Sequence, residues 1–191
     1  MRAVRAPRRN KGFDETHREM IGTAVRLIAE SGVEALSIAA LARRMGINRA
    51  TVYYHFAHRE ALVGAVKDWA SGELARGMDV GASARDRIGH ISHFVLENPE
   101  LIKLWIEDFV SGRDIRDSYT RWDELVAGVA ASFAAKGQEI DAEVYCVMLL
   151  AASIIGPRVF AASVRPGMSV EDVAARFLRE EQRTLHRDGL E

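Results

Sequence analysis

The chain has 191 residues, of which 48% are hydrophobic and 28% are charged, and its formal net charge is −1. This length suits one large domain or two small ones, each with a proper hydrophobic core. A single cysteine excludes an internal disulfide. No apolar run approaches the ~18 residues of a membrane span, so we expect a cytoplasmic protein that does not bind a membrane.

The charge is divided unevenly along the chain. Residues 1–62 hold 11 Lys and Arg against 6 Asp and Glu, whereas residues 63–191 hold 15 against 21. Only the first segment has the basic balance that suits a polyanion. Because residues 1–12 include five basic side chains and no acidic one, we expect residues 1–14 to form a disordered arm. Such an arm adds affinity for DNA by releasing counterions; a solvated tail is the alternative.

Three helices are predicted in the region that follows. The first covers residues 16–31, and Gly32 ends it. The second covers residues 38–45, with Ser37 as an N-cap whose hydroxyl accepts a backbone N–H. The third begins at Arg49, directly after a second N-cap residue, Asn48.

The connection between the second and third helices is too short for anything but a helix-turn-helix. Gly46 adopts the left-handed conformation that ends a helix at low cost, and Ile47 then enters the core. A turn of this length sets two helices at roughly 90–120°, which lets the second enter a major groove of DNA.

The third helix, over residues 49–56, separates an inward face from an outward one. Val52 and Phe56, four residues apart, point inward. An arginine can pair with guanine, alanine and threonine methyl groups can touch thymine, and tyrosine or histidine can bind phosphates. Packing of Tyr53 and Tyr54 beneath the next helix is the alternative. The side chains expected to face outward are Arg49, Ala50, Thr51, Tyr53 and His55.

The segment LSIAALARRMGINRATVYYHFAHREAL resembles the DNA-binding signature of TetR/AcrR-type bacterial transcriptional regulators. Asn48 replaces the usual Ser and Arg59 the usual Lys, and both replacements keep the chemistry. The resemblance implies a homodimer whose C-terminal domain dimerises and binds a small effector. The resulting DNA-binding set is Ser37, Arg49, Ala50, Thr51, Tyr53, His55 and Arg59, with Arg59 meeting a phosphate.

The remaining pattern is helical to the end, and no strand signal competes with it. We therefore predict an all-α fold of about nine helices, with a DNA-binding domain over residues 15–62 and an effector-binding and dimerisation domain over residues 63–191. The further helices are expected at about residues 58–77, 84–97, 99–112, 115–136, 141–162 and 169–186.

The last two of these helices are predicted to form the homodimer interface. Apolar stripes and small residues such as Ala151, Ala152 and Gly156 favour a two-fold four-helix bundle. An ordinary intramolecular core with only a weak dimer contact is the alternative.

Aromatic and polar residues before the last helices suggest an effector cavity, although a solid helical core would show the same pattern. We expect no metal, since His90 and His93 lack a third ligand, and no cofactor. The candidate cavity residues are Met78, His90, Phe94, Trp105, Phe109, Trp122 and Met148.

The favoured function is a repressor that a small-molecule effector releases from a palindromic operator. The sequence has no phosphate-binding glycine loop, nucleophile elbow, two-histidine metalloprotease helix or paired cysteine ligands, so we expect no enzyme. An enzyme with an unmarked site, a helical adaptor and a constitutive DNA binder without an effector remain as alternatives.

Overall fold

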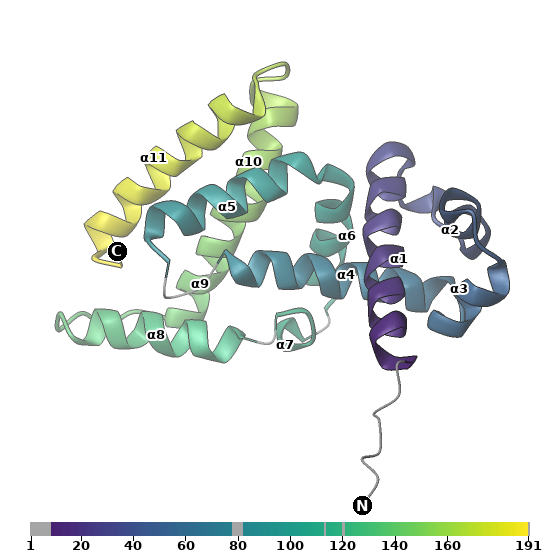
Figure 1. Cartoon of the computed structure of the whole chain (residues 1–191). Helices are drawn as coiled ribbons and strands as arrows, with labels where there is room; N and C mark the ends of the chain where they lie inside the picture. The colour runs from purple at the N-terminus through teal and green to yellow at the C-terminus, as the bar shows by residue number, and fades with distance from the viewer. Residues whose placement is uncertain (1–8, 78–81, 113, 120, 191) are drawn as a thin grey trace, which may run out of the picture. The chain divides into compact units, whose positions relative to one another are not determined.

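A computed structural model describes residues 9–77, 82–112, 114–119 and 121–190, and within these ranges all regular structure is helical (Figure 1). The all-α fold expected from the sequence is therefore confirmed. The chain divides into two compact units, Met1–Trp69 and Ala70–Glu191. The division between these units lies inside helix α4 (Arg59–Arg76).

The N-terminal unit contains α1 (Arg9–Ser31), the 3-10 turn η1 (Val33–Ala35), α2 (Ile38–Met45), α3 (Arg49–His55) and the first part of α4. Helix α2 packs against both α1 and α3. The core of this unit consists of fully buried apolar side chains from every helix, including Met20, Ile28, Leu41, Val52 and Leu62.

Helix α1 begins earlier than the sequence indicated. The helix starts at Arg9, so residues 9–14, expected in the disordered arm, are helical, and the first eight residues of that arm lie outside the described part of the chain. Phe13 explains the extension, because its ring stacks on those of His17 and His55. Through this aromatic contact, an early turn of α1 whose other residues are polar packs against α3.

Side-chain caps begin the helices where the sequence predicted them. Ser37 Oγ accepts from Ala40 N at 3.1 Å, and Asn48 Oδ1 accepts from Ala50 N at 2.9 Å. Gly46 ends α2 in the left-handed conformation with φ of 66°. Each cap satisfies a backbone group that has no partner inside its helix.

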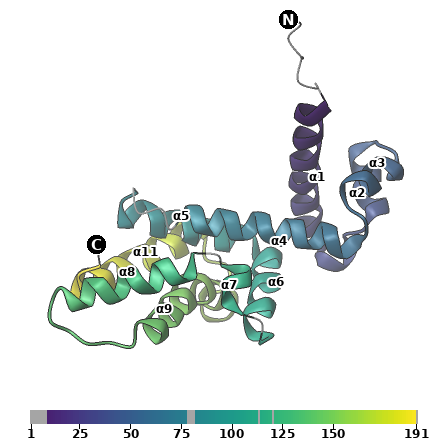
Figure 2. The same cartoon turned by 90° about the horizontal axis from the view of Figure 1, so that it is seen from below.

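Four helices of the C-terminal unit contribute buried residues to its core, together with the long helix described below. They are α5 (Ala84–Glu97), α6 (Pro99–Val110), α8 (Trp122–Ala134) and α11 (Val170–Asp188). Helix α5 runs along α11, as Figures 1 and 2 both show. At that contact Leu96, Val173 and Ala174 are buried together.

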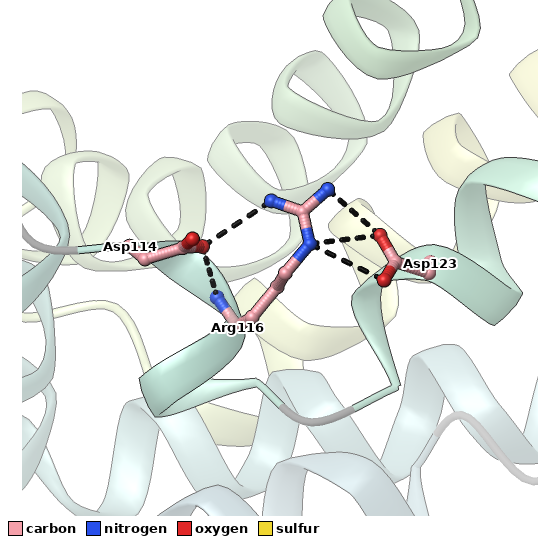
Figure 3. Close-up of polar contacts among 3 residues, drawn as sticks. All are labelled: Asp114, Arg116 and Asp123. Atoms are coloured by element: carbon pink, nitrogen blue, oxygen red, sulfur yellow. Dashed lines mark hydrogen bonds and ion pairs between the residues drawn. The ribbon is translucent and has the colours of Figure 1, made fainter.

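The helix predicted over residues 115–136 is divided in two. A short helix, α7 (Ile115–Ser118), precedes α8, and Tyr119 leaves the helical conformation and is buried. Arg116 explains the break, because its guanidinium binds both Asp114, the N-cap of α7, and Asp123 in the first turn of α8 (Figure 3). The backbone N–H of Arg116, which donates to Asp114 Oδ1 at 2.9 Å, and then the guanidinium bond hold the pKa of that carboxyl below its ordinary value.

One long helix covers Ala142–Val164, close to the predicted residues 141–162. It consists of α9 (Ala142–Leu150), the π-helical segment η2 (Ala151–Ile155), α10 (Gly156–Val159) and a second π-helical segment, η3 (Phe160–Val164). Pro157 accounts for the first π segment, since it has no N–H and its ring would meet the carbonyl of Ser153 in a regular helix.

The same helix corrects one expectation from the sequence. A window of 18 residues has a mean hydropathy of 1.8, so the helix has the length and composition of a membrane span, and only 22% of the window is buried. Counting uninterrupted apolar side chains missed it, because alanine, serine and glycine separate the larger residues. A single such helix is weak evidence of a membrane, yet its low burial requires an explanation.

Candidate functional site

Helix α3 is held in place by two buried side chains and by its cap. Val52 is fully buried and Phe56 is 3% exposed, as their spacing predicted. The Asn48 cap fixes the first turn, and the backbone N–H of Phe56 closes the last turn on Val52 O at 2.9 Å. The seven residues of α3 therefore form a short helix that packs on the unit through one buried face.

The opposite face of α3 is open to solvent. Arg49, Ala50 and Thr51 are exposed, and Tyr53 is 54% exposed. Tyr54 is 72% exposed, and its ring meets Phe13 edge-on. The face thus offers a guanidinium, methyl groups and two phenolic hydroxyls, which are groups that bind base edges and phosphates.

His55 differs from the expected outward position. Its ring is half-buried and stacks on Phe13 with the ring centroids 4.2 Å apart, and it lies 5.5 Å from the ring of His17. Burial, followed by repulsion from His17, lowers the pKa of His55. A histidine in this setting favours the neutral form and attaches α3 to α1.

Arg59 and Ser37 both serve the local fold. Arg59 donates from Nε to Leu36 O at 2.8 Å and from a terminal guanidinium nitrogen to Val33 O at 2.9 Å. These bonds attach the start of α4 to the segment before α2, and Glu34 adds an ion pair at 3.6 Å. Ser37 uses its hydroxyl as the α2 cap.

A cavity of about 510 Å³ lies within the C-terminal unit. Its walls come from α5, α8, the α9–η2 segment and α11, and most lining side chains are apolar, among them Ile88, Ile91, Leu125, Leu150 and Phe177. This volume lies in the range of pockets that bind small molecules, and the mixture of apolar walls with a few polar groups is typical of them.

Three hydrogen bonds join the helices α8, α9 and α11, which contribute to the lining of this cavity. Lys136, at the end of α8, donates from Nζ to the carbonyl oxygens of Asp188 and Gly189. Tyr145 on α9 donates from its hydroxyl to the Asp188 carboxylate. These contacts hold the ends of α8, α9 and α11 together. They therefore fix the positions of three cavity walls relative to one another.

Glu181 is the lining residue with the most unusual environment. Its Oε2 accepts from Ser153 Oγ at 3.0 Å, whereas its Oε1 is buried and has no hydrogen-bond partner among the described residues. Burial raises the pKa of this carboxyl to about 7, although the bond from Ser153 acts in the opposite direction. The cavity therefore contains a carboxylate whose hydrogen-bonding capacity is incompletely used.

Comparison with known proteins agrees with the geometry of the N-terminal unit. Residues 20–66 match the family model of bacterial regulatory proteins, tetR family. This match covers the buried part of α1, the helix-turn-helix and the start of α4. Residues 20–66 therefore form a DNA-binding domain of the TetR family.

Several solved structures share the fold of this chain over most of its length. A TetR/AcrR regulator from Thermobifida fusca is 21% identical with a TM-score of 0.60, and the match covers 86% of this chain and 95% of that one. A TetR/AcrR regulator from Aquifex aeolicus is 12% identical with a TM-score of 0.62, covering 89% and 99%.

A third similar structure was solved with a ligand. It is a protein from Saccharomonospora viridis, described as a transcriptional regulator in complex with choline; it is 20% identical with a TM-score of 0.59, covering 86% of this chain and 94% of that one. No curated protein matches the sequence.

The described residues that the sequence suggested for an effector site lie outside this cavity. Phe94, Trp105 and Trp122 are buried, Phe109 packs on Trp105, His90 and Met148 are exposed, and none of these six lines the cavity described above. Met78 lies outside the described residues.

Sequence reasoning did not identify Glu181 as a cavity residue. A glutamate among apolar positions of an amphipathic helix was the available signal, because a charge at such a position requires a partner.

Proposed function

We propose that this chain, with its TetR-family DNA-binding domain, is a cytoplasmic repressor that binds a palindromic operator as a homodimer. The observation that carries the proposal is the exposed face of α3, where Arg49, Ala50, Thr51 and Tyr53 stand on a helix held by Val52, Phe56 and its cap. Arg49, in the first turn of α3, pairs with a base, and Tyr53 and Tyr54 bind phosphates.

The same interface includes Ser37, His55 and Arg59, but these three residues mainly position its helices. The Ser37 hydroxyl and the Arg59 guanidinium are engaged by the protein backbone, so their main contribution is to position α2 and α3. His55 positions α3 against α1 through its ring contact with Phe13. Any contact of these three side chains with phosphate is secondary.

The homodimer forms through the long helix Ala142–Val164 together with α11. Large apolar side chains on that helix are exposed, among them Val144 at 55%, Met148 at 63% and Val159 at 51%. An apolar stripe on a helix that is only 22% buried is covered by a second copy in a four-helix bundle. Dimerisation also supplies the second recognition helix that a palindrome requires.

The cavity of the C-terminal unit is the effector site in this proposal. The choline complex of the Saccharomonospora viridis protein is a precedent for a small ligand in a chain of this fold. An effector releases the operator if it binds more tightly to a conformer whose two α3 helices do not match successive major grooves, roughly 34–36 Å apart.

Selection of bound duplexes from a random library tests the proposal. We expect an inverted repeat with half-sites one or more helical turns apart, and a linear fall of log affinity against log salt. A half-site without a repeat would contradict the dimer. Absence of any enriched sequence, together with weak and salt-insensitive binding, would contradict the DNA-binding function.

A further inference from the structure

We propose that the cavity of the C-terminal unit takes a protonated amine with an apolar body, whose ammonium group binds the Glu181 carboxylate. This inference rests on the proposed effector site and adds the chemical class of the ligand. It follows from the walls of the cavity, from its charge and from the unused hydrogen-bonding capacity of Glu181.

The cavity walls define the apolar part of the ligand. Ile88 and Ile91 of α5, Leu125 of α8, Leu150 of α9 and Phe177 of α11 contribute hydrocarbon surface from four directions. A ligand enclosed in this way gains roughly 25 cal/mol for each Å² of apolar surface removed from water. A small, fully polar cation would leave these walls without a partner.

The charged side chains of the cavity define the polar part of the ligand. Glu124 on α8 and both Glu180 and Glu181 on α11 line it, and Arg87 on α5 is the cationic lining residue. Glu124 and Glu180 are ion-paired with two arginines outside the lining, Arg121 and Arg183. Arg87 donates to Ala82 O at 3.0 Å. Glu181 differs, since its partner among the described residues is the uncharged Ser153 hydroxyl, so a cationic ligand suits its carboxylate.

Glu181 is the group that fixes the ammonium. Ser153 holds Oε2, while Oε1 is buried without a donor, and a buried acceptor that lacks a partner costs free energy. Glu181 lines the cavity, and the terminal torsion of a glutamate is broad, so rotation about it can turn a carboxylate oxygen toward a ligand. A ligand N–H then supplies the missing donor as a charge-assisted hydrogen bond, which is stronger than a neutral one.

Proton linkage is a direct consequence of this geometry. The pKa of Glu181 is about 7 in the free protein, and a bound cation stabilises the carboxylate, so it lowers that pKa. Amine binding below pH 7 therefore releases a proton. Affinity rises with pH to about 7 and stays level until the amine itself loses its proton, near pH 10 for an alkylamine.

Three probes with one skeleton test the proposal: 4-phenylbutylamine, 4-phenylbutanol and 4-phenylbutyrate, titrated calorimetrically into the full-length protein without DNA. We expect the amine to bind at least about 10-fold more tightly than the alcohol, which corresponds to about 1.4 kcal/mol, and the carboxylate to bind most weakly. Titration at pH 6 in two buffers of different ionisation enthalpy is expected to show proton release with the amine alone.

Glu181→Gln is the decisive variant, because glutamine keeps a hydrogen bond to Ser153 and removes the charge. It is expected to reduce amine affinity at least about 10-fold, to leave alcohol affinity unchanged and to abolish proton release. Glu171→Gln, at an exposed position of α11 outside the cavity lining, is the matched control and retains the release. Equal affinities for amine and alcohol, or an unchanged Glu181→Gln variant, would overturn the assignment.

A DNA titration separates this inference from the proposed function. If the amine binds through Glu181 but leaves DNA affinity unchanged, the ligand class stands and the release mechanism fails. If an uncharged or anionic compound binds the cavity and releases DNA, the effector function stands and the cationic ligand class fails.

Discussion

The two units of the molecule present their candidate sites in opposite ways. The DNA-facing residues of the N-terminal unit lie on one short helix, within the six positions 49–54, and project outward. The cavity of the C-terminal unit takes its lining from segments between residues 77 and 190 and faces inward. A site made by one helix can be read from local spacing, whereas a site made between helices depends on tertiary packing.

The largest expected effect is at the predicted dimer surface. A change there tests whether dimerisation through the C-terminal unit is needed for DNA binding by the N-terminal unit. Met148→Asp places a charge in the centre of the exposed apolar stripe, where a partner helix would have to desolvate it. We expect a monomer by sedimentation and a loss of roughly 100-fold or more in affinity for a full palindrome, because the second half-site no longer adds its binding energy.

Ala127→Asp, on an exposed position of α8, is the matched control for that variant and should remain dimeric. A Met148→Asp protein that stays dimeric would place the interface on another surface.

A variant of Arg59 tests whether this side chain stabilises the helix-turn-helix or contacts DNA directly. Arg59→Ala removes two hydrogen bonds to the carbonyls of Val33 and Leu36, so we expect a loss of about 1–3 kcal/mol of unfolding free energy. Denaturant titration followed by circular dichroism measures it, with Arg43→Ala on the exposed face of α2 as the control. Unchanged stability with a shallower salt dependence of DNA binding would make Arg59 a phosphate contact.

At Glu181 we expect the charge of the carboxylate to favour ligand binding and to reduce the stability of the folded protein. The pKa of this carboxyl is raised from 4.5 to about 7, so the folded state holds a proton that the unfolded state has lost, and stability falls as pH rises between these values. Glu181→Gln should therefore raise the unfolding free energy by about 1–3 kcal/mol at pH 8 and have little effect near pH 4.5. A gain that does not depend on pH would contradict the buried carboxylate.

The helix-turn-helix was predictable because each of its signals acts within a few residues. Ser37, Gly46 and Asn48 fix the ends of α2 and α3, and the four-residue spacing of Val52 and Phe56 gives the buried face. His55 was less predictable, since its position depends on Phe13, more than 40 residues earlier in the chain. The same contact explains why α1 begins before the expected residue.

The C-terminal unit was predictable in fold class and less so in detail. Helix periodicity gives the approximate extent of α5, α6 and α11, but the break between α7 and α8 depends on Arg116 joining two aspartates. Aromatic residues such as Trp105 and Trp122 suggested a pocket, yet they fill the core. Sequence spacing cannot tell a cavity wall from a packed core, because both use apolar residues at helical positions.

The smallest expected effect concerns the Arg116 bridge. Arg116→Ala removes exposed ion pairs with Asp114 and Asp123, and such pairs contribute little to global stability. We expect faster hydrogen exchange of the α7 amides with an unchanged unfolding midpoint. Since the pKa of Asp114 is lowered by Arg116, the protection in the native protein should weaken as pH falls through the acid range. A large fall in the unfolding midpoint would show that the break between α7 and α8 organises the whole unit.

The most direct test of the account is the affinity of the native protein and of Arg49→Ala for every single-base variant of the selected operator. Arg49 lies exposed in the first turn of α3, so we predict that its removal costs about 1–3 kcal/mol on the best site and relaxes preference at one position in each half-site. Discrimination at the other positions should be retained. A uniform loss across all variants, with every preference intact, would contradict base reading by the exposed face of α3.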